Sequence, residues 1–283
     1  HYGKTPPCTK SIIESGIEKV YYSINDIDKK VRGRSFNILT KKKILVKKGL
    51  LKDEITNLYD SYSINRKNKL PYVTGKIAIS KNKLIYSKGT KRITDQFSDK
   101  LSHYLRFKND AIMISSKTLN IDNPKLNCRL EGYENYSPKR IVLDKNLNIK
   151  LNSFILKSTK KNNTIIFHNS TNFLKMNILK KKGIKLIKSK LNKDKQFDLK
   201  IILKKLYVLN VRNVLIEGGD KLTKNFIKKR LINQFYLFQS PKNLSKSKKY
   251  LTFSSLNILK KVFGRNSSNT SKLAKDKITI YKR

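Results

Sequence analysis

The second half of the chain alternates helix-like and strand-like segments, and this alternation constrains the fold more than any other feature. The helical segments carry apolar residues three or four positions apart, whereas the extended segments are short apolar runs. The pattern predicts helices at 173–182, 199–209 and 222–231, and strands at 184–187 and 211–216. Strands that alternate with helices pair in parallel, because each connection must return to the same end of the sheet. The sequence therefore predicts an α/β fold with a largely parallel central sheet flanked by helices.

One strand-to-helix junction has the composition of an anion site. An apolar run from Val214 ends in an acid and two glycines, and the next segment carries Leu222, Phe226 and Ile227 as a helical apolar stripe. Glycines let backbone approach a ligand, and the unpaired N–H groups at a helix start face an anion. The same pattern is typical of an ordinary strand-to-helix connection, so both interpretations stay open on this segment alone.

The chain as a whole forms two blocks that meet near Asn68, where we place a domain boundary between residues 1–67 and 68–283. The first block alternates as αβαβ, with helices at 11–15 and 36–42, strands at 20–24 and 44–46, a helix around Ile55, Leu58 and Tyr59, and a polar stretch at 63–69. The second block adds strands at 72–79, 111–114, 140–143, 164–167, 235–238 and 277–281, a helix at 97–106 with Phe97, Leu101, Tyr104 and Leu105 on one face, and loops at 115–129, 245–249 and 266–272.

Charge and cysteine content narrow the functional classes. A formal charge of +46 favours polyanion binding, but the lysines are spread along every segment and no zinc-finger, helix-turn-helix or aromatic RNA-binding signature accompanies them. We therefore expect no dedicated nucleic-acid site, and keep a basic nucleotide- or RNA-binding module as the alternative. No run approaches the ~18 apolar residues of a membrane span, and no signal peptide is apparent. Cys8 and Cys128 are expected to be free thiols, and the chain to be cytoplasmic.

Six motifs follow one another along the second block. They are P-Y-V-x-x-K-x-A-x-S from Pro71, I-T at 93–94, L-R-x-x-x-D-A-I from Leu105, T-x-x-x-D-N-P-x-L-x-x-R from Thr118, P-x-R-I-V-L-D from Pro138, and I-E-G-G from Ile216. In this order they resemble the bifunctional riboflavin-biosynthesis deaminase/reductase family. The resemblance implies a dihydrofolate-reductase-like domain that uses NADPH to reduce the ribose of 5-amino-6-(5-phosphoribosylamino)uracil to a ribityl chain. It also implies a homo-oligomer formed through the reductase domain.

The resemblance assigns residues to two ligands. The substrate contacts it implies are Thr90, Arg106, Leu126, Arg129 and Glu217. The cofactor contacts it implies are Ala78, Arg92, Thr118, Asp122, Gly219, Asp220, Lys221, Leu222, Thr223, Lys224 and Asn225. An arginine fork can grip a phosphate with two hydrogen bonds. Glu217 either accepts hydrogen bonds from the substrate or caps the following helix, and Lys76 is a candidate polar contact, although a lysine at the start of a strand is expected to be exposed.

The N-terminal segment His1–Cys8 resembles the end of the family's zinc-deaminase motif, which implies the C-terminal remnant of a cytidine-deaminase-like αβα domain. In an intact parent, Cys8 would be one zinc ligand. A catalytic zinc needs three protein ligands and an open position for water, so we expect no deaminase activity from this chain. Deamination as the main activity would require a His-x-Glu motif and a first cysteine upstream of His1, and we expect a longer parent protein.

The chain departs from the family pattern at four places. Ser80-Lys81-Asn82-Lys83 stands where Ser-Leu-Asp-Gly is usual, and the loop that follows is expected to be short. Arg92 replaces a tryptophan against the cofactor, Asn233-Gln234 replaces Asp-Glu, and Lys145 replaces a small polar residue. These departures raise the expectation that reductase activity is reduced or lost.

Overall fold

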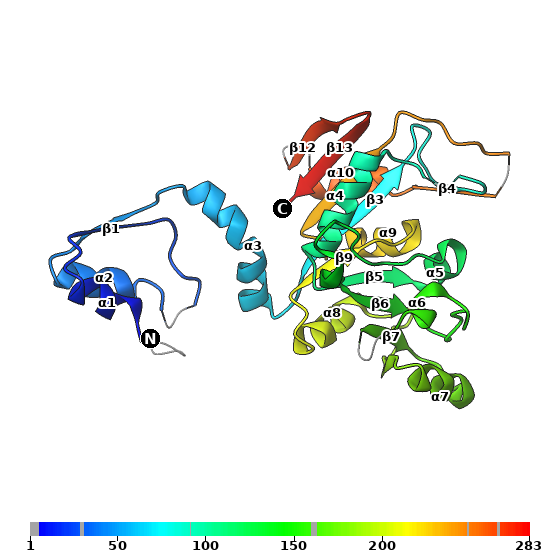
Figure 1. Ribbon diagram of the computed structural model, residues 1–283, viewed down its shortest axis with the longest axis horizontal. Helices are drawn as coiled ribbons and strands as arrows, with labels where there is room; N and C mark the ends of the chain where they lie inside the picture. Colours follow the sequence, from blue (N-terminus) through cyan, green and yellow to red (C-terminus); the bar gives the residue numbers. More distant parts are fainter. Residues whose placement is uncertain (1–5, 29–30, 91, 160–162, 248, 265–266) are drawn as a thin grey trace. The chain divides into compact units, whose positions relative to one another are not determined.

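The structure is a computed structural model that describes residues 6–28, 31–90, 92–159, 163–247, 249–264 and 267–283. The chain divides between Leu70 and Pro71 into two compact units, shown by their sequence colours in Figure 1. This division lies three residues beyond the boundary placed near Asn68.

The first unit has the predicted order αβαβ followed by a long helix. Its elements are α1 (Cys8–Glu14), β1 (Lys19–Tyr22), α2 (Arg34–Lys41), β2 (Leu45–Lys48) and α3 (Lys52–Asn68). Strands β1 and β2 pair in parallel. The prediction of a polar segment after the last helix is wrong, because α3 continues through it. Its C-terminal turn is tied by the Asn65 amide, which donates to the Leu70 carbonyl at 3.0 Å.

The second unit is built on a sheet of nine described strands. They are β3 (Tyr72–Ile79), β5 (Ala111–Ser115), β6 (Lys139–Leu143), β7 (Thr164–His168), β8 (Lys185–Lys188), β9 (Asn213–Ile216), β10 (Gln234–Gln239), β12 (Ser268–Leu273) and β13 (Asp276–Lys282). Their order is β12-β13-β10-β3-β9-β5-β6-β7-β8. The strands from β10 to β8 pair in parallel, and β13 and β12 are antiparallel at one edge. The predicted largely parallel sheet is confirmed.

Helices flank this sheet and close its core (Figure 1). They are α4 (Gln96–Phe107), α5 (Ser116–Asp122), α6 (Phe154–Lys157), α7 (Phe173–Lys181), α8 (Leu199–Val208), α9 (Asp220–Lys228) and α10 (Leu256–Phe263), with a 3-10 turn η1 (Glu134–Tyr136). The core joins strand residues such as Ile112, Val142 and Leu215 to Leu119 of α5 and Leu179 of α7, all fully buried. Because apolar burial is the main favourable term in folding, this core fixes where the strand ends lie.

Several segments predicted as loops are ordered elements. Residues 115–129 contain α5, whose N-cap Ser115 accepts a hydrogen bond from the Thr118 N–H. Within the segment predicted as a loop at 266–272, Asn266 lies outside the described residues, and residues 268–272 belong to β12. That strand has exposed polar side chains and is held by backbone pairing to β13, so no apolar alternation marks it. Two short strands, β4 (Leu84–Ser87) and β11 (Tyr250–Thr252), pair across a long separation that local patterns do not reveal.

Helix α4 buries a more polar face than its apolar pattern predicts. Phe97 and Tyr104 are 46% and 45% exposed, whereas Ser98, Ser102 and His103 are buried beside Leu105. These polar groups are buried with partners. The Ser98 hydroxyl donates to the Asp276 carboxylate at 2.6 Å, and the Ser102 hydroxyl donates to the Ser98 carbonyl at 2.9 Å. Burial of polar groups is tolerated when they are hydrogen-bonded, so this face of α4 can point inward.

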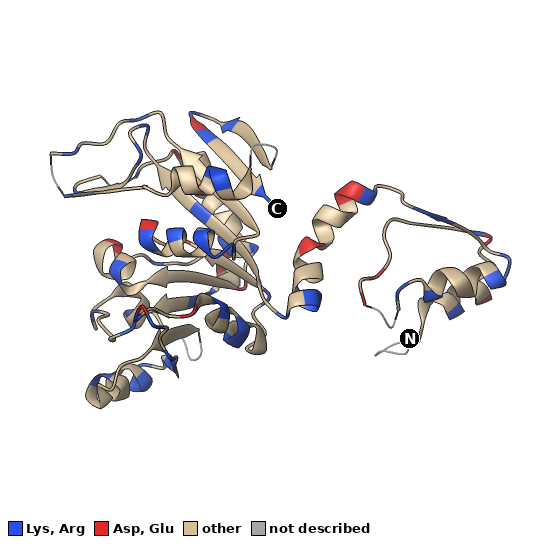
Figure 2. Ribbon diagram, turned by 180° about the vertical axis from the view of Figure 1, so that it is seen from behind, with Lys and Arg blue, Asp and Glu red and all other residues tan. Residues whose placement is uncertain are grey.

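Positive charge is distributed over the whole molecule. Figure 2 shows lysines and arginines on helices, strands and connecting loops of both units, with acidic residues scattered among them. Among the helices that the structure describes, none has the length and apolar character needed to cross a bilayer. Both cysteines are free thiols, as expected, with Cys8 exposed and Cys128 buried.

Candidate active site

A cavity of about 440 Å³ opens where the carboxyl ends of β3, β5 and β9 meet. Ligands of parallel α/β sheets bind at this edge, because the strand-to-helix turns converge there. Its wall includes Lys76, Ile77 and Ala78 of β3, Ser115, Lys117, Thr118, Ile121 and Asp122 around α5, and the segment 217–222. Ile85, Tyr86, Leu251 and Thr252 of the small β4–β11 sheet and the nearby Ile93 complete it.

The N-terminus of α9 forms one side of this cavity. Gly219 is the N-cap with φ −67°, and no side chain caps the helix. Its N–H donates to Thr118 Oγ1 at 3.2 Å, while the first-turn residues Asp220, Lys221 and Leu222 line the cavity. The Asp220 carboxylate is engaged by Ser254 and Ser255, whose hydroxyls both donate to it at 2.6 Å. An uncapped helix N-terminus facing a cavity is suited to an anionic ligand.

The two glycines of this corner have different surroundings. A Cβ on Gly218 would lie 2.8 Å from Leu222 Cδ2 and 3.1 Å from Leu222 Cβ, so packing excludes a side chain there. A Cβ on Gly219 would meet only Thr118 Oγ1 among its close neighbours, at an ordinary 3.5 Å. The space beside Gly219 therefore belongs to the cavity, and glycine there leaves room for a ligand.

An ion pair between Glu217 and Arg106 closes another side of the site. Arg106 Nε and Nη2 donate to the two carboxylate oxygens at 3.1 and 2.8 Å, and Nη1 donates to the Asn127 carbonyl at 3.2 Å. The two side chains are 13% and 12% exposed. Burial acts to raise the pKa of Glu217, but the charges of Arg106 and Lys76 outweigh it, so the pKa lies below its ordinary value. Glu217 is therefore an anion, and the fork of Arg106 is already engaged.

Lys76 contributes a half-buried ammonium to the same cavity. Its Nζ lies 4.9 Å from the centre of the Phe238 ring. Burial lowers the pKa of Lys76, the charge of Glu217 opposes this, and the charge of Arg106 adds to it. The expectation of an exposed lysine at the start of a strand is wrong, because Lys76 is the fifth residue of β3 and lies in the cavity wall. Arg106 lies on α4, Lys76 on β3 and Glu217 after β9, so only the fold brings the three together.

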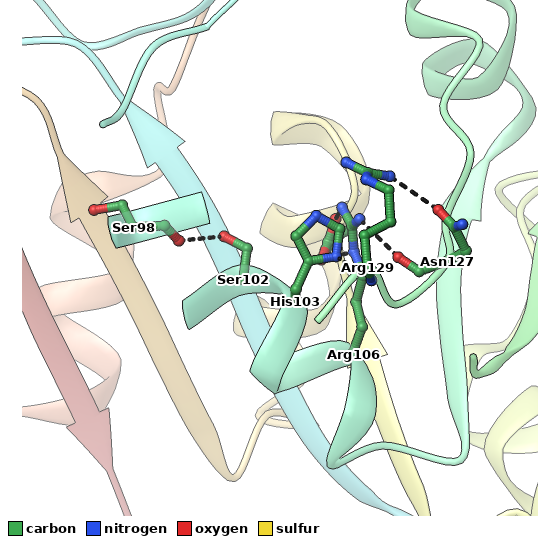
Figure 3. Close-up of polar contacts among 7 residues, drawn as sticks. Ser98, Ser102, His103, Arg106, Asn127 and Arg129 are labelled. Atoms are coloured by element: carbon green, nitrogen blue, oxygen red, sulfur yellow. Dashed lines mark hydrogen bonds and ion pairs between the residues drawn. The ribbon is translucent and has the colours of Figure 1, made fainter. Parts of the chain in front are cut away.

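The loop after α5 carries two further predicted residues, Leu126 and Arg129, of which Figure 3 shows Arg129. Leu126 is 2% exposed with its side chain in the core, so only its backbone remains for a ligand. Arg129 has an exposed side chain, and its Nη1 donates to Asn127 Oδ1 at 2.9 Å. The Arg129 N–H donates to Nδ1 of His103 at 3.1 Å. Sequence reasoning did not single out His103, although its place three residues before Arg106 puts both on one helix face.

Arg106, Leu126, Arg129 and the remaining predicted residues lie outside the cavity wall. Arg92 pairs with Asp99 at 2.8 Å with more than half of its side chain exposed, and the Thr90 N–H donates to the Ser87 carbonyl. Thr223 is buried and its hydroxyl donates to the Gly218 carbonyl at 3.3 Å. Lys224 lies further along α9, and the Asn225 amide donates to Gln196 at 3.0 Å. Of the predicted cofactor residues, the cavity wall contains Ala78, Thr118, Asp122 and the segment from Gly219 to Leu222.

The segment that departs from the family pattern leads into β4, whose Ile85 and Tyr86 line the cavity. Asn82 donates to the Leu244 carbonyl at 2.8 Å and accepts from the Leu244 N–H, which ties the start of β4 to the segment before β11. Lys83 has φ +63°, a left-handed conformation at the position where the family usually has glycine. Asn233 keeps the acceptor of the aspartate it replaces, since its Oδ1 accepts from the Val73 N–H at 2.8 Å. Lys145 donates to the Lys195 carbonyl at 3.5 Å.

A zinc site was expected only in an intact parent. Within the described ranges, His, Cys, Asp and Glu side chains form no group of three that could hold a metal ion. Cys8 lies at the start of α1, whereas residues 1–5 of the motif that precedes it are outside the described residues.

Comparison with known proteins identifies the family of the second unit. The family model for the RibD C-terminal domain matches residues 71–273, which is most of the second unit. The chain belongs to the RibD C-terminal domain family. It is 31% identical over 244 residues to riboflavin biosynthesis protein RibD of Actinobacillus pleuropneumoniae, and 32% identical over 244 residues to RibD of Aquifex aeolicus. These matches cover 86% of the chain but only 64% and 66% of the two relatives.

Solved structures agree on the fold. RibD from Acinetobacter baumannii superposes with a TM-score of 0.79 at 22% identity, covering 100% of this chain and 77% of the other. A diaminohydroxyphosphoribosylaminopyrimidine deaminase/5-amino-6-(5-phosphoribosylamino)uracil reductase from Thermotoga maritima gives 0.78 at 24% identity, covering 100% and 76%. The second unit of this chain thus has the RibD-like α/β reductase fold predicted from its motifs.

Proposed function

We propose that residues 71–283 form an NADPH-dependent reductase of riboflavin biosynthesis that converts the ribose of 5-amino-6-(5-phosphoribosylamino)uracil to a ribityl chain. The observation that carries this proposal is that one cavity joins an uncapped helix N-terminus to a buried Lys76–Glu217–Arg106 cluster. The first feature suits the pyrophosphate of a dinucleotide, and the second suits a polar sugar. The relatives named as riboflavin biosynthesis proteins support the same assignment.

The residues present fit the cofactor. The first turn of α9 offers backbone N–H groups to a pyrophosphate, and the room beside Gly219 lets the chain approach it. Lys117 and Lys221 add positive charge at the cavity wall, while Ala78 and Ile85 offer apolar surface to a ring. When bound, NADPH supplies a hydride, and the protein positions the two molecules and excludes water.

The charged cluster is placed to bind and protonate the sugar. Glu217 is held as a carboxylate by Arg106 and can accept hydrogen bonds from ribose hydroxyls. Reduction at the anomeric carbon breaks its bond to the ring oxygen, which must take up one proton as the carbon takes up the hydride. Lys76 is the candidate donor, because its side chain lines the cavity near Glu217 and burial lowers the pKa of its ammonium, which makes it a stronger acid. Arg129 is the candidate contact for the substrate phosphate.

The test is NADPH oxidation, followed at the nicotinamide absorbance, by the purified chain with and without 5-amino-6-(5-phosphoribosylamino)uracil and without added zinc. We expect oxidation that depends on this substrate. Lys76→Gln should lower kcat with little effect on NADPH affinity, and Lys100→Gln on the outer part of α4 is the matched control. A folded protein that oxidises no NADPH, but binds RNA with strong salt dependence, would instead support the nucleic-acid alternative.

Three family expectations go with this proposal. Deamination and its zinc belong to an intact parent, since the matched relatives are longer than this chain. The enzyme is proposed to act in the cytoplasm and to form a homo-oligomer through its reductase domain. Light scattering on the purified chain tests the oligomer, for which a monomeric mass at working concentration is the contrary result.

A further inference from the structure

The loop that carries Arg129 is held by a set of specific contacts. Leu126 anchors it in the core and has φ +52°, a backbone conformation that a leucine adopts only when its surroundings impose it. The Cys128 N–H donates to Ser137 Oγ at 3.1 Å, and the Asn127 carbonyl accepts from Arg106 at 3.2 Å. At Arg129 itself, the backbone N–H donates to His103 Nδ1 at 3.1 Å, while the side chain is exposed.

His103 is suited to accept this hydrogen bond. It is 8% exposed and lies on α4 one turn before Arg106, with both side chains directed toward the loop (Figure 3). An Nδ1 that accepts requires the neutral imidazole with its proton on Nε2, because both nitrogens are donors in the charged form. Arg106 and Arg129 disfavour that charged form, as does burial, while Glu217 and the Asn127 carbonyl favour it.

The two arginines near this loop have different contacts and therefore different roles. Arg106 has its fork engaged by Glu217 and its Nη1 by the Asn127 carbonyl, so it is committed to the protein. Arg129 has an exposed side chain, tied at Nη1 to Asn127. A substrate phosphate at this end of the site would therefore be met by Arg129, whose position depends on where the loop backbone is held.

We propose that His103 is a positioning residue that fixes the backbone of Arg129 and thereby aims its guanidinium at the phosphate of the substrate. This inference rests on the proposed function, in that it takes a sugar phosphate as the ligand. His103 itself contacts neither substrate nor cofactor. Its effect should therefore appear in affinity for phosphorylated ligands and not in the chemical step.

The experiment compares His103→Leu, which removes the acceptor, with His103→Asn, which keeps an acceptor oxygen at the same branch of the side chain as Nδ1. Ser102→Ala is the matched control, because Ser102 is buried on the same helix but bonds to the Ser98 carbonyl. Loss of one backbone hydrogen bond with a donor left unsatisfied is expected to raise KM for the substrate about tenfold in His103→Leu. The kcat should stay within about twofold, and His103→Asn should recover most of the affinity.

A binding measurement separates this inference from the proposed reaction. Calorimetric titration with ribose 5-phosphate and with ribose reports the phosphate contact without turnover. We expect His103→Leu and Arg129→Ala each to weaken ribose 5-phosphate binding, and the double variant to be no weaker than Arg129→Ala, because both changes act on one contact. If the chain oxidises no NADPH but shows this pattern, the reaction is wrong and the positioning role stands. Additive losses, an unchanged affinity in His103→Leu at full folding, or no binding of ribose 5-phosphate by the wild type would each overturn it.

Discussion

The cavity combines two kinds of binding site. The α9 side is a backbone site, made by one continuous segment from the end of β9 through the first turn of α9. The other part is a side-chain site, where Lys76 of β3 and Arg106 of α4 gather around Glu217 at the start of that segment. A backbone site depends on room and on unpaired N–H groups, whereas a side-chain site depends on buried charges that must neutralise one another. The two sides should therefore respond differently to substitution.

The largest expected effect is on the side-chain site. Arg106→Ala leaves the largely buried Glu217 carboxylate without the partner that binds both of its oxygens, and breaking a buried pair in this way costs about 3 kcal/mol of unfolding free energy. Arg92→Ala removes an exposed arginine paired with Asp99 and should cost less than ~1 kcal/mol. Urea unfolding of both variants measures the difference. Equal losses would mean that the Arg106–Glu217 pair is no more important than a surface contact.

Substitutions at the two glycines of the backbone site should have different effects. Gly218→Ala places a methyl group against Leu222, so we expect a loss of about 2 kcal/mol of unfolding free energy from overpacking. Gly219→Ala should leave stability within about 0.5 kcal/mol, while filling space that the cofactor needs and weakening NADPH binding. Denaturant unfolding and NADPH titration on both variants test this. If NADPH binds Gly219→Ala as tightly as wild type, the cofactor phosphates lie elsewhere.

The side-chain site should also show a pH dependence that the backbone site lacks. Burial, followed by Arg106 and Arg129, lowers the pKa of His103 from 6.5 to about 4, against the opposing effect of Glu217. The unfolded chain then binds more protons between these pH values, so stability is fully present above pH 6.5 and falls as the pH drops toward 4. The loss is on the order of 2 kcal/mol after allowance for solvent reaching part of the ring.

His103→Asn should remove this part of the pH dependence. Burial also lowers the pKa of His168, which contributes in the same direction, so the difference between wild type and His103→Asn isolates His103. Unfolding free energies at pH 7 and pH 5 supply the four values needed. Parallel pH profiles for the two proteins would show that His103 is not held neutral by its surroundings.

The smallest effect concerns the turn into β4, the strand whose Ile85 and Tyr86 line the cavity. Lys83 adopts φ +63° at the turn into β4, where a glycine would be free of strain. Lys83→Gly should therefore stabilise the fold by about 0.5 kcal/mol, after the greater flexibility of the unfolded chain is subtracted. Lys81→Gly, at a neighbouring position without a positive φ, is the control and should be destabilising. A stabilisation by both, or by neither, would show that the turn is not strained.

Prediction from sequence succeeded where the signal was local. Short apolar runs predicted β3 and β5 to β10 close to their observed bounds. For central strands such as β5, β6 and β7 the reason is that a strand buried on both faces needs a continuous apolar run. The prediction missed β12, whose side chains are polar and exposed, and it missed α5, which is short and begins at a serine cap. It also missed the β4–β11 pairing, which depends on contacts between distant segments and on Asn82.

The candidate site also has a part that the sequence predicted and a part that it did not. The glycine corner before α9 was recognisable in the sequence, because one short segment contains the strand end, the two glycines and the helix start. The burial of Lys76, the pairing of Arg106 with Glu217, and the contact of His103 with the Arg129 backbone were not, since each needs partners supplied by another part of the chain. Local sequence determines backbone geometry through propensity and steric limits, but electrostatic environment is set by what the tertiary fold places within a few ångströms.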